Sequence, residues 1–147
     1  MNQQLRLLAR AIKYRYKLDP AEVSFLQSAV RPGMTAIDLG AHKGAYCYWL
    51  AKAVGGRGRV VAVEPQQGLA ERLRVVMGTR KQVAVEWAAI SSSTGTGELS
   101  LRPDGSSHGA SIAGFADGEV GDTVEVPTIT LRDLMRKHDL DSLDFIK

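Results

Sequence analysis

Residues 35–44 read TAIDLGAHKG, a short apolar run that ends in a loop with two glycines. Residues 46–54 then return to the helical spacing of apolar side chains. Residues 59–63 (RVVAV) form an almost continuous β-branched run, which is typical of a strand buried on both faces of a parallel sheet. The order strand, loop, helix, strand predicts a βαβ unit, the building block of α/β folds.

The same alternation continues toward the C-terminus. Residues 69–77 suit another helix and residues 82–87 another strand, so the segment predicts a βαβαβ unit with right-handed crossovers. We therefore predict an α/β, Rossmann-like fold with a doubly wound, mostly parallel sheet.

Weaker signals follow residue 90. Residues 91–120 are rich in glycine and serine and favour a hairpin or a mobile loop. We expect a short strand at residues 124–126, a helix at residues 131–138 and a core strand at residues 143–146. Because the sequence ends directly after this last strand, we expect the sheet to be incomplete on its C-terminal side, with an edge open to pairing in a homodimer.

Two helices are expected before residue 32. Residues 3–17 predict an amphipathic helix with basic residues between apolar side chains at helical spacing, which are Leu5, Leu8, Ala9, Ile12 and Tyr16. The simplest interpretation is that this apolar face docks on the protein; the alternative is peripheral contact of the basic helix with anionic lipid. Asp19 is expected to cap a second helix, which starts at Pro20 and runs to about residue 30.

The composition is that of one globular domain. The 147 residues are 44% hydrophobic and 24% charged, and no stretch approaches the roughly 20 apolar residues that span a bilayer. The N-terminus has no secretory signal pattern, so the expected location is the cytoplasm.

The basic excess is concentrated before Asp19 instead of being spread over a face with aromatic residues, which argues against nucleic-acid binding. Cys47 is the only cysteine and no pair of histidines or cysteines has ligand spacing, so neither a disulfide nor a metal site is expected.

Acids and glycines at the predicted strand ends form the candidate binding site. Asp38 and Gly40 end the first strand, Gly44 follows in the loop, and Glu64 stands at the end of the second strand. Ligands of open α/β sheets lie across the carboxyl ends of the strands, where a glycine lets the main chain come close. Glu64 is placed to accept hydrogen bonds from both hydroxyls of a ribose, and Asp38 to order the loop and face an ammonium group.

The loop lacks the pattern of a dinucleotide site. Such a site needs Gly-x-Gly-x-x-Gly, but the third and sixth positions counted from Gly40 are His42 and Ala45. A nicotinamide-dependent dehydrogenase is therefore the weaker alternative. The loop favours a nucleoside ligand without phosphate, such as S-adenosylmethionine.

Several stretches resemble the FkbM-type family of class I S-adenosylmethionine-dependent methyltransferases. They are residues 34–44 (MTAIDLGAHKG), 61–65 (VAVEP), 88–91 (AAIS), 126–131 (VPTITL) and 143–147 (LDFIK). The resemblance covers roughly residues 32–147, which we expect to form a partial methyltransferase domain behind the N-terminal helices of residues 1–31.

The resemblance implies S-adenosylmethionine as cofactor and methyl transfer, usually onto oxygen, as the reaction. We expect the acceptor to be a small molecule or a saccharide hydroxyl. Matched to the family's motifs, the expected cofactor-binding residues are Asp38, Gly40, Ala41, His42, Gly44, Glu64, Pro65, Trp87 and Ala88.

The chain also departs from the family pattern. The family often has an amide side chain where His42 stands and an acid where Thr130 stands, and it continues from a lysine like Lys147 into an acidic motif. We therefore expect this chain to carry the cofactor half of the site, with a non-catalytic module that pairs through its last strand as the alternative. A hydroxyl acceptor needs a base, for which His42 and His108 are the candidates, whereas His138 suits a partner of a helix dipole.

Overall fold

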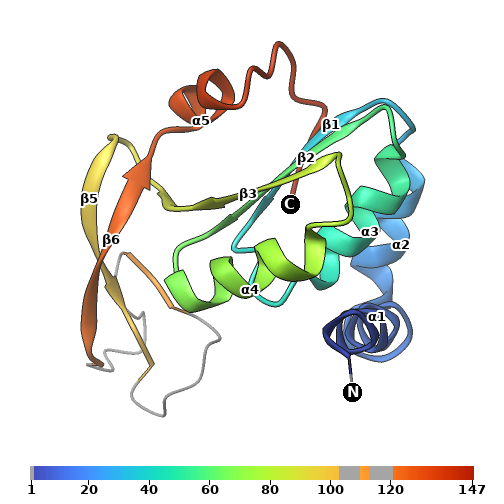
Figure 1. Ribbon diagram of the computed structural model, residues 1–147, viewed down its shortest axis with the longest axis horizontal. Coiled ribbons are helices and arrows are strands. Elements are labelled where there is room, and N and C mark those ends of the chain that lie inside the picture. The colour runs from blue at the N-terminus through green and yellow to red at the C-terminus, as the bar shows by residue number, and fades with distance from the viewer. Residues whose placement is uncertain (1, 103–109, 113–120) are drawn as a thin grey trace.

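The computed structural model describes residues 2–102, 110–112 and 121–147 (Figure 1). The helices are α1 (Gln3–Lys13), the π-helical segment η1 (Tyr14–Leu18), α2 (Pro20–Ala29), α3 (Ala45–Val54), α4 (Gln67–Met77) and α5 (Leu131–Lys137). The strands are β1 (Thr35–Leu39), β2 (Arg59–Glu64), β3 (Val83–Trp87), β4 (Ala89–Ile90), β5 (Gly95–Ser100), β6 (Thr123–Ile129) and β7 (Phe145–Ile146). The elements predicted up to β3 are all present, with bounds shifted by a residue or two, except that the helix predicted at residues 3–17 is α-helical only to Lys13 and continues as η1.

The first sheet has the strand order β3-β2-β1-β7, and every neighbouring pair is parallel. The strands added after β1 lie on both sides of it, which defines a doubly wound sheet. The predicted α/β fold is confirmed. β7 is shorter than predicted, because only Phe145 and Ile146 pair with β1. No described strand pairs with the outer edge of β7, and the homodimer expected there stays a prediction.

Helices cover both faces of the first sheet, which explains the apolar run of β2. Ala36 and Val60 belong to the core shared with α1–α4, whereas Ile37 and Val61 belong to a second core with Leu134 of α5. In Figure 1, α3 and α4 lie on one side of the sheet and α5 lies on the other. Each valine or isoleucine buried in this way contributes about 1.5–3 kcal/mol relative to an exposed one.

A second sheet with the order β4-β6-β5 lies beyond β3. β5 and β6 form an antiparallel pair, in which Gly95 lies opposite Thr128 and Ser100 opposite Thr123. The hairpin or mobile loop expected within residues 91–120 falls partly outside the described residues, and its strand β5 pairs with a strand beyond residue 120. The strand predicted at residues 124–126 is therefore longer, and its parallel pairing with β4 was not predicted. The buried core of this sheet is small and consists of Ala89, Leu99 and Val126. The sequence therefore gives only a weak apolar signal for the sheet.

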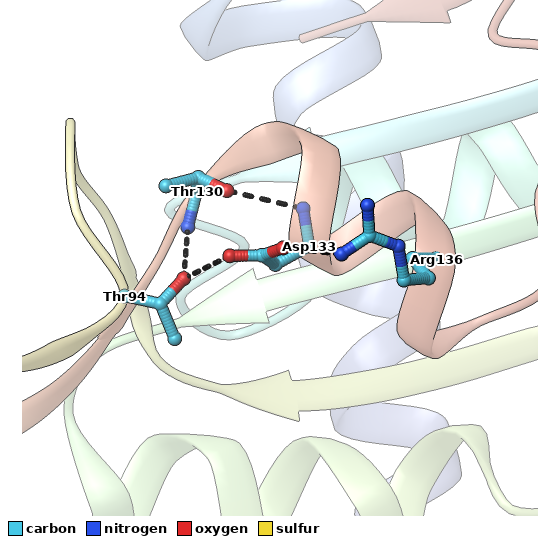
Figure 2. A network of polar contacts seen from close by, with 4 residues as sticks. All are labelled: Thr94, Thr130, Asp133 and Arg136. Carbon is cyan, nitrogen blue, oxygen red and sulfur yellow. Dashed lines mark hydrogen bonds and ion pairs between the residues drawn. The ribbon is translucent and has the colours of Figure 1, made fainter.

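A polar network joins the second sheet to α5 (Figure 2). The Asp133 main-chain N–H donates to Thr130 Oγ1 at 3.1 Å, so Thr130 caps the helix. The Thr130 N–H donates to Thr94 Oγ1 at 3.1 Å, and the Thr94 hydroxyl donates to the Asp133 carboxylate. Hydrogen bonds from these two hydroxyls, that of Thr94 more than that of Thr130, hold the pKa of Asp133 below its usual value. An aspartate can fill the same capping role as Thr130.

The first helix docks through a different face from the one predicted. Leu5 and Ile12 are 56% and 43% exposed, whereas Leu7 and Ala11 are buried in the core beside α3. The Trp49 indole Nε1–H donates to the Ala11 carbonyl at 2.9 Å. Helical spacing alone does not decide between the two faces. We call the exposed row the α1 stripe; it consists of Leu5, Leu8, Ile12 and Tyr16.

Asp19 stands at the N-cap of α2 with Pro20 behind it, as predicted, but its side chain does not cap the helix. The Tyr46 hydroxyl of α3 donates to the Asp19 carboxylate instead, which lowers the pKa of Asp19. Val23 and Leu26 of α2 lie in the same core as α3, so both N-terminal helices pack on the sheet domain. The division between residues 31 and 32 stays a prediction. No helix in the described part of the chain is long and apolar enough to cross a membrane.

Candidate functional site

The loop after β1 lies against the tip of β2. The main-chain N–H groups of Gly40 and Ala41 both donate to the Val63 carbonyl, at 2.9 and 3.0 Å. Because β1 and β2 are parallel, this contact brings the glycine loop and the end of β2 to one edge of the sheet. The edge is the one at which open α/β sheets bind ligands.

The structure requires glycine at Gly40 and at Gly44 for different reasons. Gly40 has φ +70°, and a Cβ added to it would meet no atom of the described residues within 4 Å, so these residues leave the space above its main chain open. Gly44 has φ +82°, and its Cβ would lie 2.7 Å from Leu73 Cδ1 and 3.1 Å from Met77 Cε of α4. Gly44 therefore lets α3 begin close to α4, whereas Gly40 faces open space.

Glu64 is held at the tip of β2 by main-chain hydrogen bonds. Its side chain is 2% exposed; Oε2 accepts the His42 N–H at 2.7 Å and Oε1 accepts the Gln66 N–H at 2.8 Å. Burial raises the pKa of Glu64, and these two hydrogen bonds oppose the rise. His42 has φ +49°, a conformation uncommon for a residue with a side chain, which turns its N–H toward Glu64.

Asp38 lies below the loop, within the protein. It is 1% exposed, and its Oδ2 has no hydrogen-bond partner among the described residues. Burial raises its pKa to about 7, against the opposing effects of Lys147 and of a main-chain hydrogen bond from Cys47 at the start of α3. Asp38 thus connects the loop to α3 from beneath and does not line the cavities described next.

Two neighbouring cavities open at this edge. One, of about 230 Å³, is lined by Gly40, His42 and Glu64 among others. The second, of about 380 Å³, has a mostly apolar lining that includes Ala88. Gly40 and Pro65 line both cavities, so the two adjoin along the strand tips.

The remaining predicted site residues have distinct positions. The Trp87 indole Nε1–H donates to the Pro65 carbonyl at 2.9 Å, which ties the end of β3 to the end of β2. His138 is the C-cap residue of α5, and its Nε2 lies 3.0 Å from Glu86 Oε2, so its role as a partner of the helix dipole stays a prediction. His108 lies outside the described residues. Six of the nine expected cofactor-binding residues line these cavities: Gly40, Ala41, His42, Glu64, Pro65 and Ala88. Trp87 contacts Pro65, whereas Gly44 packs against α4 and Asp38 is buried beneath the loop.

Sequence reasoning missed the contribution of other elements to this cavity. Arg10 and Tyr14 reach it from the N-terminal helices, Tyr46 from α3, and Lys147 from the residue after β7. The Lys147 ammonium lies 4.4 Å from the centre of the Tyr46 ring and forms an ion pair with Glu22 at 3.3 Å. These residues lie far apart in sequence, and only the basic character of the first helix offered a signal. Within the described ranges, no group of three or more His, Cys, Asp or Glu side chains is arranged to hold a metal ion.

The doubly wound sheet thus has an acid at the tip of β2 and an open glycine loop beside it, at the edge where Rossmann-like folds bind ligands. The Methyltransferase FkbM domain matches residues 38–147, which is most of the chain. The chain therefore belongs to the FkbM methyltransferase family, as the sequence motifs indicated.

Solved structures of methyltransferases are similar over part of the chain. A SAM-dependent O-methyltransferase from Thermotoga maritima is 32% identical, with a TM-score of 0.42, over 46% of this chain and 27% of that chain. A SAM-dependent methyltransferase from Aquifex aeolicus is 25% identical, with a TM-score of 0.45, over 60% of this chain and 48% of that one. Fibrillarin from Aeropyrum pernix, which contains natively bound S-adenosyl-L-methionine, is 20% identical, with a TM-score of 0.42, over 48% of this chain and 32% of that one. The matched part thus spans less than half of each of these proteins.

Proposed function

We propose that this chain binds S-adenosylmethionine at the carboxyl edge of the first sheet and serves methyl transfer to a hydroxyl of a small molecule or saccharide. The observation that carries the proposal is the buried carboxylate of Glu64 beside the open space over Gly40. Membership of the FkbM family gives the reaction class.

The donor set fits an adenosyl group. Each oxygen of Glu64 accepts one main-chain N–H and keeps capacity to accept a further hydrogen bond, as two ribose hydroxyls require. The adjoining cavity offers apolar surface at Val63, Ala88 and Leu99, which suits a flat heteroaromatic base. The Glu64 carboxylate, which lines the cavity beside the loop, also complements a ligand with positive charge.

S-adenosylmethionine supplies a methyl group on a positively charged sulfonium centre. The contribution of this chain is alignment: the loop after β1 is fixed by hydrogen bonds to Val63 and Glu64, so the binding groups are in place before a ligand arrives. His42 lines the same cavity and is our candidate base for the acceptor hydroxyl. Tyr46 is unsuited to that role, because burial, followed by its hydrogen bond to Asp19, raises its pKa.

Calorimetric titration of S-adenosylhomocysteine, the demethylated product, tests the proposal. We expect saturable binding, and at least about tenfold weaker binding by Glu64→Ala, because two ribose hydrogen bonds to a charged acceptor are lost. Glu98→Ala, an exposed change on β5, is the matched control and should bind as the wild type does. A folded chain that does not bind S-adenosylhomocysteine, or that binds NAD instead, contradicts the proposal.

A further inference from the structure

Two more cavities adjoin the one at Glu64, on the side of the first helix. One, of about 440 Å³, lies between α1 and α4, and the other, of about 490 Å³, lies along α1. Arg10, His42 and Lys43 line both of them and also the cavity at Glu64. A ligand bound there therefore lies directly beside the proposed cofactor.

The lining of these two cavities is strongly cationic. Among the described residues, it contains five basic residues and no aspartate or glutamate; the basic residues are Arg6, Arg10, Lys13, Lys43 and Arg72. None of the five forms an ion pair with a described residue. Lys147 and Lys137, by contrast, are paired with Glu22 and Glu86. Unpaired cations that surround one concavity repel one another, and a bound anion relieves that repulsion.

We infer that this concavity, which we call the cationic cavity, binds a phosphate or carboxylate group of the methyl acceptor. The inference rests on the proposed function and narrows its substrate to an anionic compound. Guanidinium groups from two elements, Arg6 of α1 and Arg72 of α4, face one space and offer paired donors to an oxyanion. Leu69 and Val76 add an apolar wall, so part of the acceptor beside the anionic group can be apolar.

The phosphate can belong to a dissolved molecule or to a lipid headgroup. The α1 stripe is exposed on the same helix that supplies Arg6 and Arg10. This exposure favours the lipid source, because apolar side chains beside basic ones suit an anionic bilayer surface. The two sources share the same chemistry at the cationic cavity and differ in whether the α1 stripe takes part.

Amide chemical shifts during titration with inorganic phosphate, at constant ionic strength, test the inference. We expect the amides of His42 and Lys43 to shift with a saturable dependence in the wild type. Arg6→Gln with Arg72→Gln should weaken phosphate binding at least about tenfold, since charge-assisted hydrogen bonds are lost. Arg6→Lys with Arg72→Lys should restore part of it by keeping the charge. Arg57→Gln with Lys81→Gln, exposed changes at the opposite edge of the sheet, should have no effect.

Two parallel measurements distinguish an acceptor site from a cofactor site, and a lipid phosphate from a dissolved one. S-adenosylhomocysteine should bind the Arg6→Gln, Arg72→Gln variant as it binds the wild type; a parallel loss would assign the cavity to the cofactor and overturn the inference. Phosphate binding that survives both glutamine substitutions overturns it as well. If the wild type binds phosphate through these arginines but does not bind S-adenosylhomocysteine, the proposed function fails while the anion site stands. Sedimentation with phosphatidylglycerol vesicles, repeated with Leu8→Ser, identifies a lipid source when binding depends on both the arginines and the α1 stripe.

Discussion

Replacement of Asp38 by asparagine should remove a pH-dependent loss of stability. Burial raises the pKa of this carboxyl from 3.8 to about 7. As the pH rises, the unfolded chain gives up the Asp38 proton near pH 4, while the folded protein keeps it until about pH 7. The contribution of Asp38 to folding is thus most favourable below pH 4 and is lost as the pH rises through 7.

The size of the effect follows from the same two values. A pKa that is raised from 3.8 to about 7 on folding lowers the free energy of unfolding by about 4 kcal/mol above pH 8, compared with its value below pH 4. Hydration of a buried charge reduces this figure, so it is an upper value. Asparagine cannot ionise, and it keeps an oxygen that accepts the Cys47 N–H. Its NH₂ group takes the place of the unpartnered Oδ2, which adds a cost that does not change with pH.

Urea unfolding of both proteins between about pH 4 and pH 8 measures the difference. The stability of Asp38→Asn relative to the wild type should increase steadily through this interval, by up to about 4 kcal/mol. Asp141→Asn, an exposed change near the last strand, is the control and should show no such trend. A difference between Asp38→Asn and the wild type that stays constant with pH would refute the reasoning.

The remaining predictions use the same unfolding assay and the cofactor titration. Gly44→Ala should cost at least about 2 kcal/mol, because its Cβ collides with Leu73 at a positive φ. Gly40→Ala should cost only about 1–2 kcal/mol for the positive φ, yet weaken S-adenosylhomocysteine binding at least about tenfold by filling the open space. Thr130→Ala should cost about 1 kcal/mol through loss of the α5 cap, whereas Thr130→Asp should cost less. Equal losses of binding in Gly40→Ala and Gly44→Ala would contradict the separate roles of the two glycines.

The central sheet and the candidate cofactor site could be predicted because their signals are local. The β-branched run of β2 reports burial on both faces, and the loop that follows β1 has glycines only where the main chain has a positive φ or a close neighbour. Glu64 could be placed at the site because a parallel strand brings its carboxyl end to the same edge as Gly40.

What the sequence did not predict depends on contacts between distant residues. Apolar spacing in the first helix marks two candidate faces, and only docking on α3 selects Leu7 and Ala11 over the α1 stripe. Asp19 has the residue type and position of a helix cap, but Tyr46 of α3 competes for its carboxylate. The cationic cavity likewise needs α1 and α4 side by side before Arg6 and Arg72 can share one space.

The most direct test of the adenosyl site uses the two tryptophans of the chain, whose indole N–H groups give separate NMR signals. Trp87 donates to the Pro65 carbonyl at the proposed site, whereas Trp49 donates to the Ala11 carbonyl in the core. Titration with S-adenosylhomocysteine should shift the Trp87 indole and the amides of Gly40 and Ala88, and leave the Trp49 indole in place. Saturable binding that leaves Trp87 and Gly40 unshifted would place the ligand elsewhere and contradict the account.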